Sequence, residues 1–430
     1  MCHYLETSGS QQGALRSQNA SELNASRPGL QSMSIRDLSD RLLKRLSRET
    51  TSGRFIPELD GLRFVAIGMV ILFHLNGYLF AKTSFYEHGA SPDWLSRAAL
   101  VGNHGVELFF VISGFILALP FAAHHLTKAP AVSLRAYYLR RLTRLEPPYF
   151  VTIFFLMFLS ALMYRTTALP LNGHLLASLF YLHNLVYSAP STVLGVAWSL
   201  EIEVQFYLLV PLLTLVFAIR HHILRRSILC GSIVGCLVLQ AVFLRGDARV
   251  SLSIAAYLQF FLLGFLLADF FLIEWRVAPK RTLAWDIAAL LGWPLLFYTL
   301  RFSGVAHWAF PALLFLLYCA AFRGFVSNRI VSSRWITAIG GMCYSIYLIH
   351  YEVISAVGRF TKSMGHSLPG PAYLLLQFII VGFAIVVVCG AYFVVLEKPC
   401  MRRDWPRRAK LWVADRISSR SRKTSVPAEA

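Results

Sequence analysis

Arg63 and His74 are ionisable residues inside a single apolar stretch, 59–79. In a helix, with about 100° and ~1.5 Å per residue, this spacing places them on nearly the same face, roughly 16 Å apart along the axis. Ionisable side chains inside a membrane span are costly and usually face a cavity or a partner. We therefore predict that this helix forms one wall of a reaction site, with His74 as general base. The alternative is a positive-inside anchor at Arg63 and an interfacial histidine.

Glu107 and Ser113 are polar residues in the next apolar run, 104–121. Glu107 stands near the start of that run, where it either favours a helix N-terminus or orients a histidine. Under the second interpretation, we expect Glu107 or Glu203 to orient His74.

The segment 198–211 carries two glutamates and an amide at the start of an apolar run. Glu201 and Glu203 are about 200° apart on a helix, so they cannot both face one cavity. Glu203 shares a face with Tyr207, four residues on. Because this start is too polar for a lipid-facing anchor, it indicates a functional site.

Three arginines, Arg140, Arg141 and Arg144, come just before Pro147–Pro148, a pair that suits the beginning of a helix. Arginines spaced i, i+4 share a face and can hold phosphate groups bidentately. The alternative is that these arginines only set the topology, because cytoplasmic loops are rich in basic residues.

Tyr344, Tyr347 and His350 form roughly one stripe at i, i+3 and i+6. The tyrosines suit the aromatic belt of a membrane interface. His350 fits that belt less well and is a candidate for a second proton-handling group.

The elements that must position these residues are apolar runs of membrane-spanning length. The chain has 430 residues, 56% hydrophobic and 15% charged, which indicates a multi-span membrane protein. Its net charge of +19 comes from basic residues in the N-terminal arm, in alternate loops and in the tail. Since topology signals are distributed in this way, we do not expect nucleic acid as a partner.

Loop charge decides which apolar runs cross the membrane. It allows a single crossing between the loop near 165 and the basic segment 220–226, where two runs, 174–188 and 198–219, are present. We predict that the shorter run is re-entrant or interfacial. The predicted fold is an all-α integral membrane protein with about ten transmembrane helices and both termini cytoplasmic.

We divide the chain into a polar N-terminal cytoplasmic arm, 1–53, a ten-span membrane domain, 54–398, and a basic cytoplasmic tail, 399–430. The arm begins with a polar, disordered stretch, 1–33. It then contains a short amphipathic helix, 34–48, expected on the membrane surface. The seven cysteines form no CxxC pair, so we expect no metal site.

Six motifs stand in the order and spacing of the membrane O-acyltransferases of the acyltransferase-three family, which the chain resembles from about Ile56 to Lys398. They are ELDGLRFVAIGMVILFH, GVELFFVISGF, RRLTRLEPPY, LHNL, WSLEIEVQFYLLVP and YSIYLIH. The resemblance implies a ten-span enzyme of the bacterial inner (plasma) membrane. Such an enzyme moves an acyl group, often acetyl, from acyl-CoA to a hydroxyl of a sugar, a cell-envelope glycan or another small acceptor.

The resemblance also implies roles for single residues. The candidates for catalysis are His74, Glu107 and Glu203. The candidates for binding acyl-CoA are Arg63, Arg140, Arg141 and Arg144. Further candidates near the substrates are Ser113, His183, Asn184, Trp198, Tyr207, Tyr347 and His350.

Two positions depart from the pattern of the family. Glu107 stands where Asp is more usual, and Val204 stands where a second acid is frequent. The second departure suggests that this acid is dispensable here or that Glu201 replaces it.

The predicted function is membrane-bound O-acyl transfer with acyl-CoA, foremost acetyl-CoA, as co-substrate and no permanently bound cofactor. The expected partners are acyl-CoA, a hydroxyl-bearing acceptor and the lipid bilayer. Transfer proceeds either directly or through an acyl-histidine intermediate. A competing hypothesis is a multi-span transporter of a glycan precursor, because intramembrane charges and ten spans fit that class too. A non-catalytic scaffold would leave His74, Glu203 and His350 unexplained.

Overall fold

The computed structural model describes residues 35–49, 55–83, 93–164, 173–243, 246–275, 279–301, 308–365, 367–402, 404–408, 410–411 and 414–415. Over these residues the chain is helical and contains no strand. The predicted disordered stretch 1–33 and the end of the predicted tail lie outside them. The chain divides into two compact units, Met1–Arg45 and Leu46–Ala430. The predicted helix of the arm is present as α2, Ile35–Leu46.

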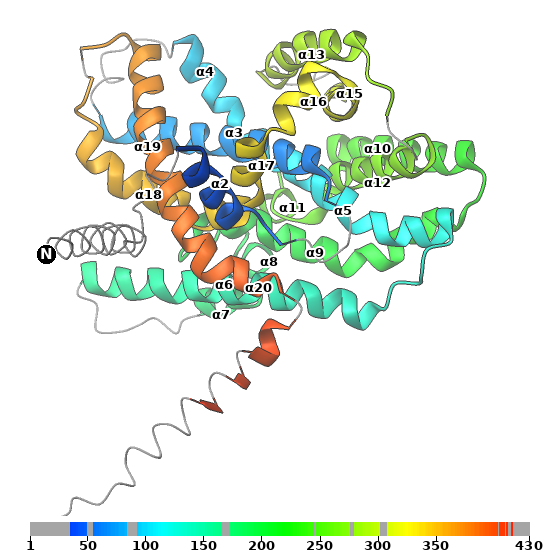
Figure 1. Ribbon diagram of the computed structural model, residues 1–430, viewed down its shortest axis with the longest axis horizontal. Coiled ribbons are helices and arrows are strands. Elements are labelled where there is room, and N and C mark those ends of the chain that lie inside the picture. Colours follow the sequence, from blue (N-terminus) through cyan, green and yellow to red (C-terminus); the bar gives the residue numbers. More distant parts are fainter. Residues whose placement is uncertain are drawn as a thin grey trace, which may run out of the picture. The chain divides into compact units, whose positions relative to one another are not determined.

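The second unit contains the long helices and the connecting turns shown in Figure 1. In chain order, its helices are α3 (Pro57–Lys82), α4 (Trp94–Leu100), η2 (Val101–His104), α5 (Gly105–Thr127), α6 (Leu134–Tyr164), α7 (Gly173–Leu179), α8 (His183–Tyr187), η3 (Gly195–Ala197), α9 (Trp198–Leu213), η4 (Thr214–Ala218), α10 (His222–Phe243), α11 (Ala248–Ser251), η5 (Ile254–Ala256), α12 (Leu258–Ile273), α13 (Leu283–Arg301), α15 (Phe310–Arg323), α16 (Val326–Val331), α17 (Arg334–Gly341), α18 (Cys343–Thr361), α19 (Gly370–Tyr392), η6 (Phe393–Glu397) and α20 (Lys398–Cys400).

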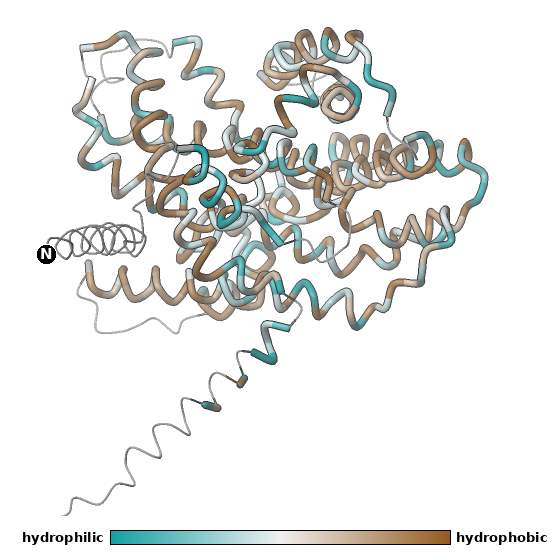
Figure 2. Tube along the Cα trace, viewed as in Figure 1, coloured by the Kyte–Doolittle hydropathy of each residue, from teal (hydrophilic) through white to brown (hydrophobic). Residues whose placement is uncertain are grey.

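Seven helices in the described part of the chain are long and apolar enough to cross a membrane. Hydrophobic residues run along most of helices such as α12 and α19 (Figure 2). Helices α12 and α15 are apolar too, but with 16 and 14 residues they are shorter than the ~20 residues of a full span. The structure therefore confirms a helical protein with several candidate spans, while the count of ten and the side of each terminus stay predictions.

The segment 174–188 forms no continuous helix. It is divided between α7 and α8, of seven and five residues, with left-handed backbone at Tyr181 and Ser188. The run 198–219, by contrast, belongs to a candidate span, 195–218. Of the two competing runs, the second has the length of a crossing, in agreement with the prediction.

Helix α6 differs from the prediction that a helix begins at Pro147–Pro148. It starts at Leu134 and continues through both prolines to Tyr164. Pro147 and Pro148 lack the N–H groups that would donate to the carbonyl oxygens of Thr143 and Arg144, four residues earlier. Other carbonyl oxygens of the same turns accept hydrogen bonds from tyrosines of later helices. The hydroxyl of Tyr344 donates to the carbonyl of Leu145 at 2.9 Å, and the hydroxyl of Tyr392 donates to that of Pro148 at 2.7 Å.

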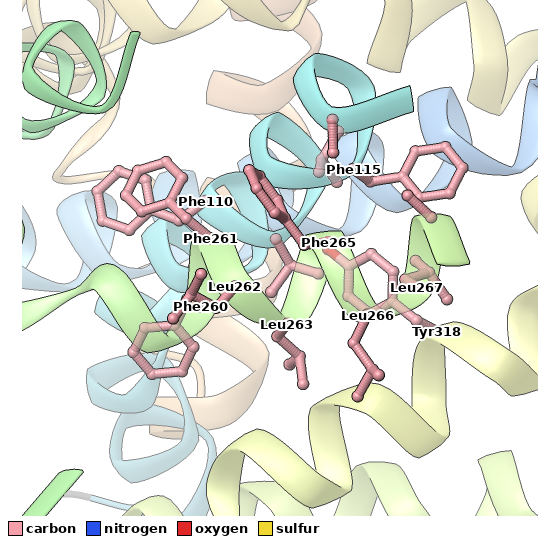
Figure 3. Packing of buried hydrophobic residues seen from close by; sticks show 14 of the residues in the cluster. Phe110, Phe115, Phe260, Phe261, Leu262, Leu263, Phe265, Leu266, Leu267 and Tyr318 are labelled. Atoms are coloured by element: carbon pink, nitrogen blue, oxygen red, sulfur yellow. The ribbon is translucent and has the colours of Figure 1, made fainter. Parts of the chain in front are cut away.

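The largest apolar core of the second unit lies where α5 packs along α12. Phe110 and Phe115 of α5 and Phe261 and Phe265 of α12 meet there, with Tyr318 of α15 alongside (Figure 3). The two backbones approach closely because glycines face each other across the contact. A Cβ atom at Gly114 would collide with the backbone of Phe261, and one at Gly264 would collide with that of Val111. This tight packing fixes α5, which carries two of the candidate residues.

Candidate active site

Arg63 is held by an acid one helical turn earlier. Helix α3 begins at Pro57, and its first turn is acidic, as suits the positive end of a helix dipole. Within it, Asp60 is fully buried and accepts hydrogen bonds from Arg63 Nη1 at 2.5 Å and from Arg48 Nε at 2.7 Å. Burial lowers the pKa of Arg48 to about 10, which still leaves it charged at neutral pH. Asp60 was not among the residues predicted from the sequence.

Two arginines of α6 join Arg63. Arg141 and Arg144, at i and i+3, are both partly buried, and Arg141 lies over the rings of Tyr137 and Tyr207 at 5.9 and 5.8 Å. Arg48, Arg63, Arg141 and Arg144, here called the arginine cluster, interact electrostatically through the pairs Arg48–Arg63, Arg48–Arg144 and Arg141–Arg144. The buried Nε atoms of Arg141 and Arg144 have no hydrogen-bond partner among the described residues.

The i, i+4 spacing suggested that Arg140 and Arg144 act as a pair, but the pair that points inward is Arg141 and Arg144. Arg140 is exposed, whereas Arg141 and Arg144 point into the protein. Because α6 continues through its prolines, all three arginines lie within one helix, and its rotation decides which of them face inward. Arg140 is thereby separated from the arginine cluster.

Glu203 of α9 lies beside the arginine cluster. Its Oε1 accepts a hydrogen bond of 2.5 Å from the hydroxyl of Ser113 on α5. Both Arg141 and Arg63 interact electrostatically with Glu203. Tyr207, one turn further along α9, is buried and faces Arg141. The predicted pair of Glu203 and Tyr207 therefore lies beside the arginine cluster.

A second buried acid near the arginine cluster was missed from the sequence. Glu397 is fully buried in a π-helical turn, a form often found at functional sites. Its Oε2 accepts hydrogen bonds from the backbone N–H of Ser345 at 2.9 Å and from the hydroxyl of Ser345 at 2.5 Å. Its electrostatic partners include Arg144 and Arg63, while Oε1 has no hydrogen-bond partner in the described parts of the chain. The only signal in the sequence was a lone carboxylate at the end of the last apolar run.

His74 lies further along α3, beside His350 of α18. The two ring centroids are 5.1 Å apart, and the ring of Tyr351 approaches His74 edge-on at 5.4 Å. His350 is fully buried, and its Nδ1 lies 3.0 Å from the carbonyl oxygens of both Ile346 and Tyr347. The structure thus brings together two histidines that are 276 positions apart in the sequence (350 − 74).

The two candidate carboxylates for orienting His74 have other partners. Glu107 is buried and its Oε1 lies 2.9 Å from Nδ1 of His104, while Glu203 pairs with Ser113. Among the described residues, neither carboxylate makes a hydrogen bond to His74. Of the three groups considered for completing the histidine site, His350 is the one that the structure places next to it.

Asn184 and Glu201 support the start of α9 from the segment 174–188. Glu201 is fully buried, and its Oε2 accepts the backbone N–H of Asn184 at 2.8 Å in the first turn of α8. The side-chain amide of Asn184 donates to the carbonyl oxygen of Trp198 at 2.8 Å. Glu201 thus serves α8, on the side away from Glu203, so its position does not support the suggestion that it replaces the missing second acid.

His183 and Tyr347 also hold backbone in place. The Nδ1–H of His183 donates to the carbonyl oxygen of Ala189 at 2.8 Å. The hydroxyl of Tyr347 donates to the carbonyl oxygen of Val196 and accepts the backbone N–H of Leu200 at 3.3 Å. These contacts fix the beginning of α9 and therefore the direction in which Glu203 points.

Helices α3 and α18 run side by side and link the two groups of residues. Near their N-terminal ends, Cys343 of α18 interacts electrostatically with Arg63 of α3. Further along, His350 contacts His74, and then the hydroxyl of Tyr78 approaches the carbonyl oxygen of Ser355 at 3.5 Å. The contacts advance together along both helices, so one shared wall leads from the arginine cluster to the histidine pair.

The described residues contain no group of three or more His, Cys, Asp or Glu side chains placed to hold a metal ion.

The family model described as an acyltransferase domain matches residues 56–394. The chain belongs to this family. Every candidate residue taken from the sequence lies in the matched range, including Arg63, His74 and His350. Two partners found in the structure, Arg48 and Glu397, lie just outside it.

Relatives within this acyltransferase family share somewhat more than a quarter of their residues with the chain. O-acetyltransferase OatA of Staphylococcus aureus strain NCTC 8325 is 28% identical over 335 residues, which are 72% of this chain and 52% of that protein. A candidate O-acetyltransferase of strain COL, SACOL0978, is 27% identical over 334 residues, 71% of this chain and 52% of that protein. The chain thus spans about half the length of the curated relatives it matches. No solved structure matches it.

Proposed function

We propose that the protein is a multi-pass membrane O-acetyltransferase that moves an acetyl group from acetyl-CoA to a hydroxyl of a cell-envelope glycan or another small acceptor. Membership of the acyltransferase family and the names of its relatives support the reaction class. One observation carries the assignment of roles. The wall of α3 and α18 has the arginine cluster at one end and the histidine pair at the other.

The arginine cluster would bind the phosphate groups of acetyl-CoA. Arginine is suited to phosphate because its planar group offers several donors in a fixed geometry. Arg141 and Arg144 each keep a buried Nε that no described residue accepts from, and such a donor is costly unless a ligand accepts from it. Asp60, Glu203 and Glu397 position the cluster and limit the repulsion among its members.

His74 would act as the general base. It takes the proton of the acceptor hydroxyl as the oxygen attacks the thioester carbonyl carbon of acetyl-CoA. The carbon–sulfur bond then breaks, and the departing CoA thiolate recovers the proton from His74. About 16 Å of helix separates Arg63 from His74, so the long arm of CoA would carry the thioester along the shared wall.

The basic segments before α3, between α5 and α6, and after α19 favour a cytoplasmic position for the arginine-cluster end and for both termini. Acetyl-CoA would then enter from the cytosol of a bacterium, and the acceptor would reach His74 from the outer side of the inner membrane.

Purified protein supplied with radiolabelled acetyl-CoA and a panel of hydroxyl-bearing glycans tests this proposal. We expect label to move to an acceptor in an ester bond that mild alkali cleaves. Release of CoA without an acceptor, as slow hydrolysis, gives a second readout that does not depend on the panel. Absence of both reactions, together with passage of a glycan across proteoliposomes unmodified, would instead support the transporter hypothesis.

A further inference from the structure

His350 has a defined tautomer because of its place in α18. Its Nδ1 lies 3.0 Å from two carbonyl oxygens, those of Ile346 and Tyr347, within its own helix. Carbonyl oxygens only accept hydrogen bonds, so Nδ1 must carry the proton. A neutral imidazole holds a single N–H, and Nε2 of His350 is therefore a free acceptor.

That acceptor has no hydrogen-bond partner among the described residues. The side chain of His350 is 0% exposed, and Nε2 is a buried atom with no hydrogen bond. A buried acceptor without a donor is unfavourable, because it loses its hydrogen bonds to water and forms none within the protein. We therefore expect it to accept a hydrogen bond during the reaction.

The ring of His74, which can donate a hydrogen bond, lies against the ring of His350. The two imidazole centroids are 5.1 Å apart. The same protein shows what this separation allows, because the rings of His174 and His183 are also 5.1 Å apart and form an Nδ1···Nε2 hydrogen bond of 2.9 Å. The centroid separation of His74 and His350 is thus one at which a nitrogen of one imidazole can reach a nitrogen of the other. The other ring neighbours of His74, Phe73 and Tyr351, approach it through aromatic faces and edges.

We propose that Nε2 of His350 accepts a hydrogen bond from His74 and so selects the His74 tautomer whose other nitrogen takes the acceptor proton. His350 is in this sense a positioning residue, and the inference rests on the proposed role of His74. As the acceptor O–H bond breaks, its proton goes to the free nitrogen of His74, and the imidazolium that forms keeps its second N–H on His350. The proton later passes to the CoA thiolate, while His350 keeps its own proton throughout.

A neutral imidazole such as that of His350 suits the apolar interior of a membrane protein as the acceptor for His74. In many enzymes a carboxylate orients the catalytic histidine. Here the two carboxylates considered for this role have other partners, Glu107 with His104 and Glu203 with Ser113. A second imidazole orients His74 without burying a further charge, which would be costly in a water-poor site.

The test compares His350→Phe with His350→Gln. Phe keeps a ring of similar size but has no acceptor, whereas the amide end of Gln occupies nearly the place of Nε2 and can accept. Tyr351→Phe is the matched control, because it keeps the ring that contacts His74 and removes only a hydroxyl. Each variant is purified as the full chain and checked for a monodisperse elution profile.

We expect His350→Phe to lower kcat for acetyl transfer about 100-fold with little change in the KM for acetyl-CoA. His350→Gln should stay within roughly tenfold of wild type, and Tyr351→Phe should match wild type. A purely structural role would make Phe the milder substitution, so equal losses in both variants, or full activity of His350→Phe, would overturn the proposal.

The rate at which diethyl pyrocarbonate modifies His74, followed by peptide mass spectrometry, separates this inference from the proposed function. The free nitrogen of an oriented His74 reacts with the reagent whatever the natural substrate is. We expect slower modification of His74 in His350→Phe and wild-type-like modification in His350→Gln; equal rates in all three proteins would refute the hydrogen bond. If wild type transferred no acetyl group but these rates differed as expected, the proposed function alone would fail.

Discussion

Asp60 and Arg63 form an ion pair of 2.5 Å across one turn of α3, with Asp60 fully buried and shared with Arg48. One carboxylate thus holds two of the four cations of the arginine cluster. It fixes their directions, while the Nε donors of Arg141 and Arg144 have no hydrogen-bond partner within the part of the chain that the structure describes.

Removing the charge of Asp60 should damage donor binding and stability together. In Asp60→Asn two buried guanidinium groups lose their counter-ion, and breaking a buried pair on one side typically costs about 3–5 kcal/mol. We expect a lower midpoint of thermal unfolding in detergent and a raised KM for acetyl-CoA. Glu58→Gln, in the same helical turn, is the control and should change neither strongly. An Asp60→Asn protein with wild-type melting and KM would show that the pair is incidental.

Arg144 and Arg140 provide a matched test of the cluster, because both lie on α6 but only Arg144 points inward. Arg144→Ala removes a buried donor, and a charge-assisted hydrogen bond contributes about 1.5–3 kcal/mol. The KM for acetyl-CoA should therefore rise by roughly 10- to 100-fold. Arg140→Ala removes the same formal charge at an exposed position and should leave the KM nearly unchanged. Equal effects of the two substitutions would indicate a general influence of charge.

Glu203 and Glu201 are two residues apart in the chain but face different surroundings. Glu203→Gln weakens the contact with Ser113 and changes the charge beside Arg141, so we expect a loss of activity with normal abundance. Glu201→Gln replaces the buried carboxylate that accepts from the α8 backbone by a neutral amide, which is a weaker acceptor, so we expect reduced thermal stability first. Activity per folded molecule and melting temperature, measured for both variants, distinguish the two roles. The assignment would be reversed if Glu201→Gln lost activity while folding normally.

His74→Ala should abolish acetyl transfer while the protein remains abundant, because general-base catalysis typically contributes 10²- to 10⁴-fold. Near-wild-type turnover in this variant would exclude His74 as the base. Rapid-quench mass spectrometry of the wild type distinguishes the two chemical routes. An acetyl group trapped on the peptide containing His74 would show a covalent intermediate, and its absence during steady turnover would favour direct transfer.

Much of this arrangement follows from local sequence. The apolar runs identify long helices. The loop charges allow one crossing between residues 165 and 220, and the length of 198–219 favours it over 174–188; the structure shows a helix of spanning length in the first run and two short helices in the second. The eleven-residue spacing of Arg63 and His74 places both on one face of α3 before any coordinates are considered. These features depend only on helix geometry and on the cost of burying charge, so they can be predicted from each segment of the sequence by itself.

The partners of each polar residue depended on the tertiary structure. Sequence pattern could not tell that Glu107 pairs with His104, that Glu201 holds the turn at Asn184, or that His350 lies against His74. It also did not reveal Glu397, or that Arg141 points inward in place of Arg140. The physical reason is that a helix fixes only which residues share a face. The rotation and contacts of packed helices, set by close approaches such as Gly114 against Phe261, decide what that face meets.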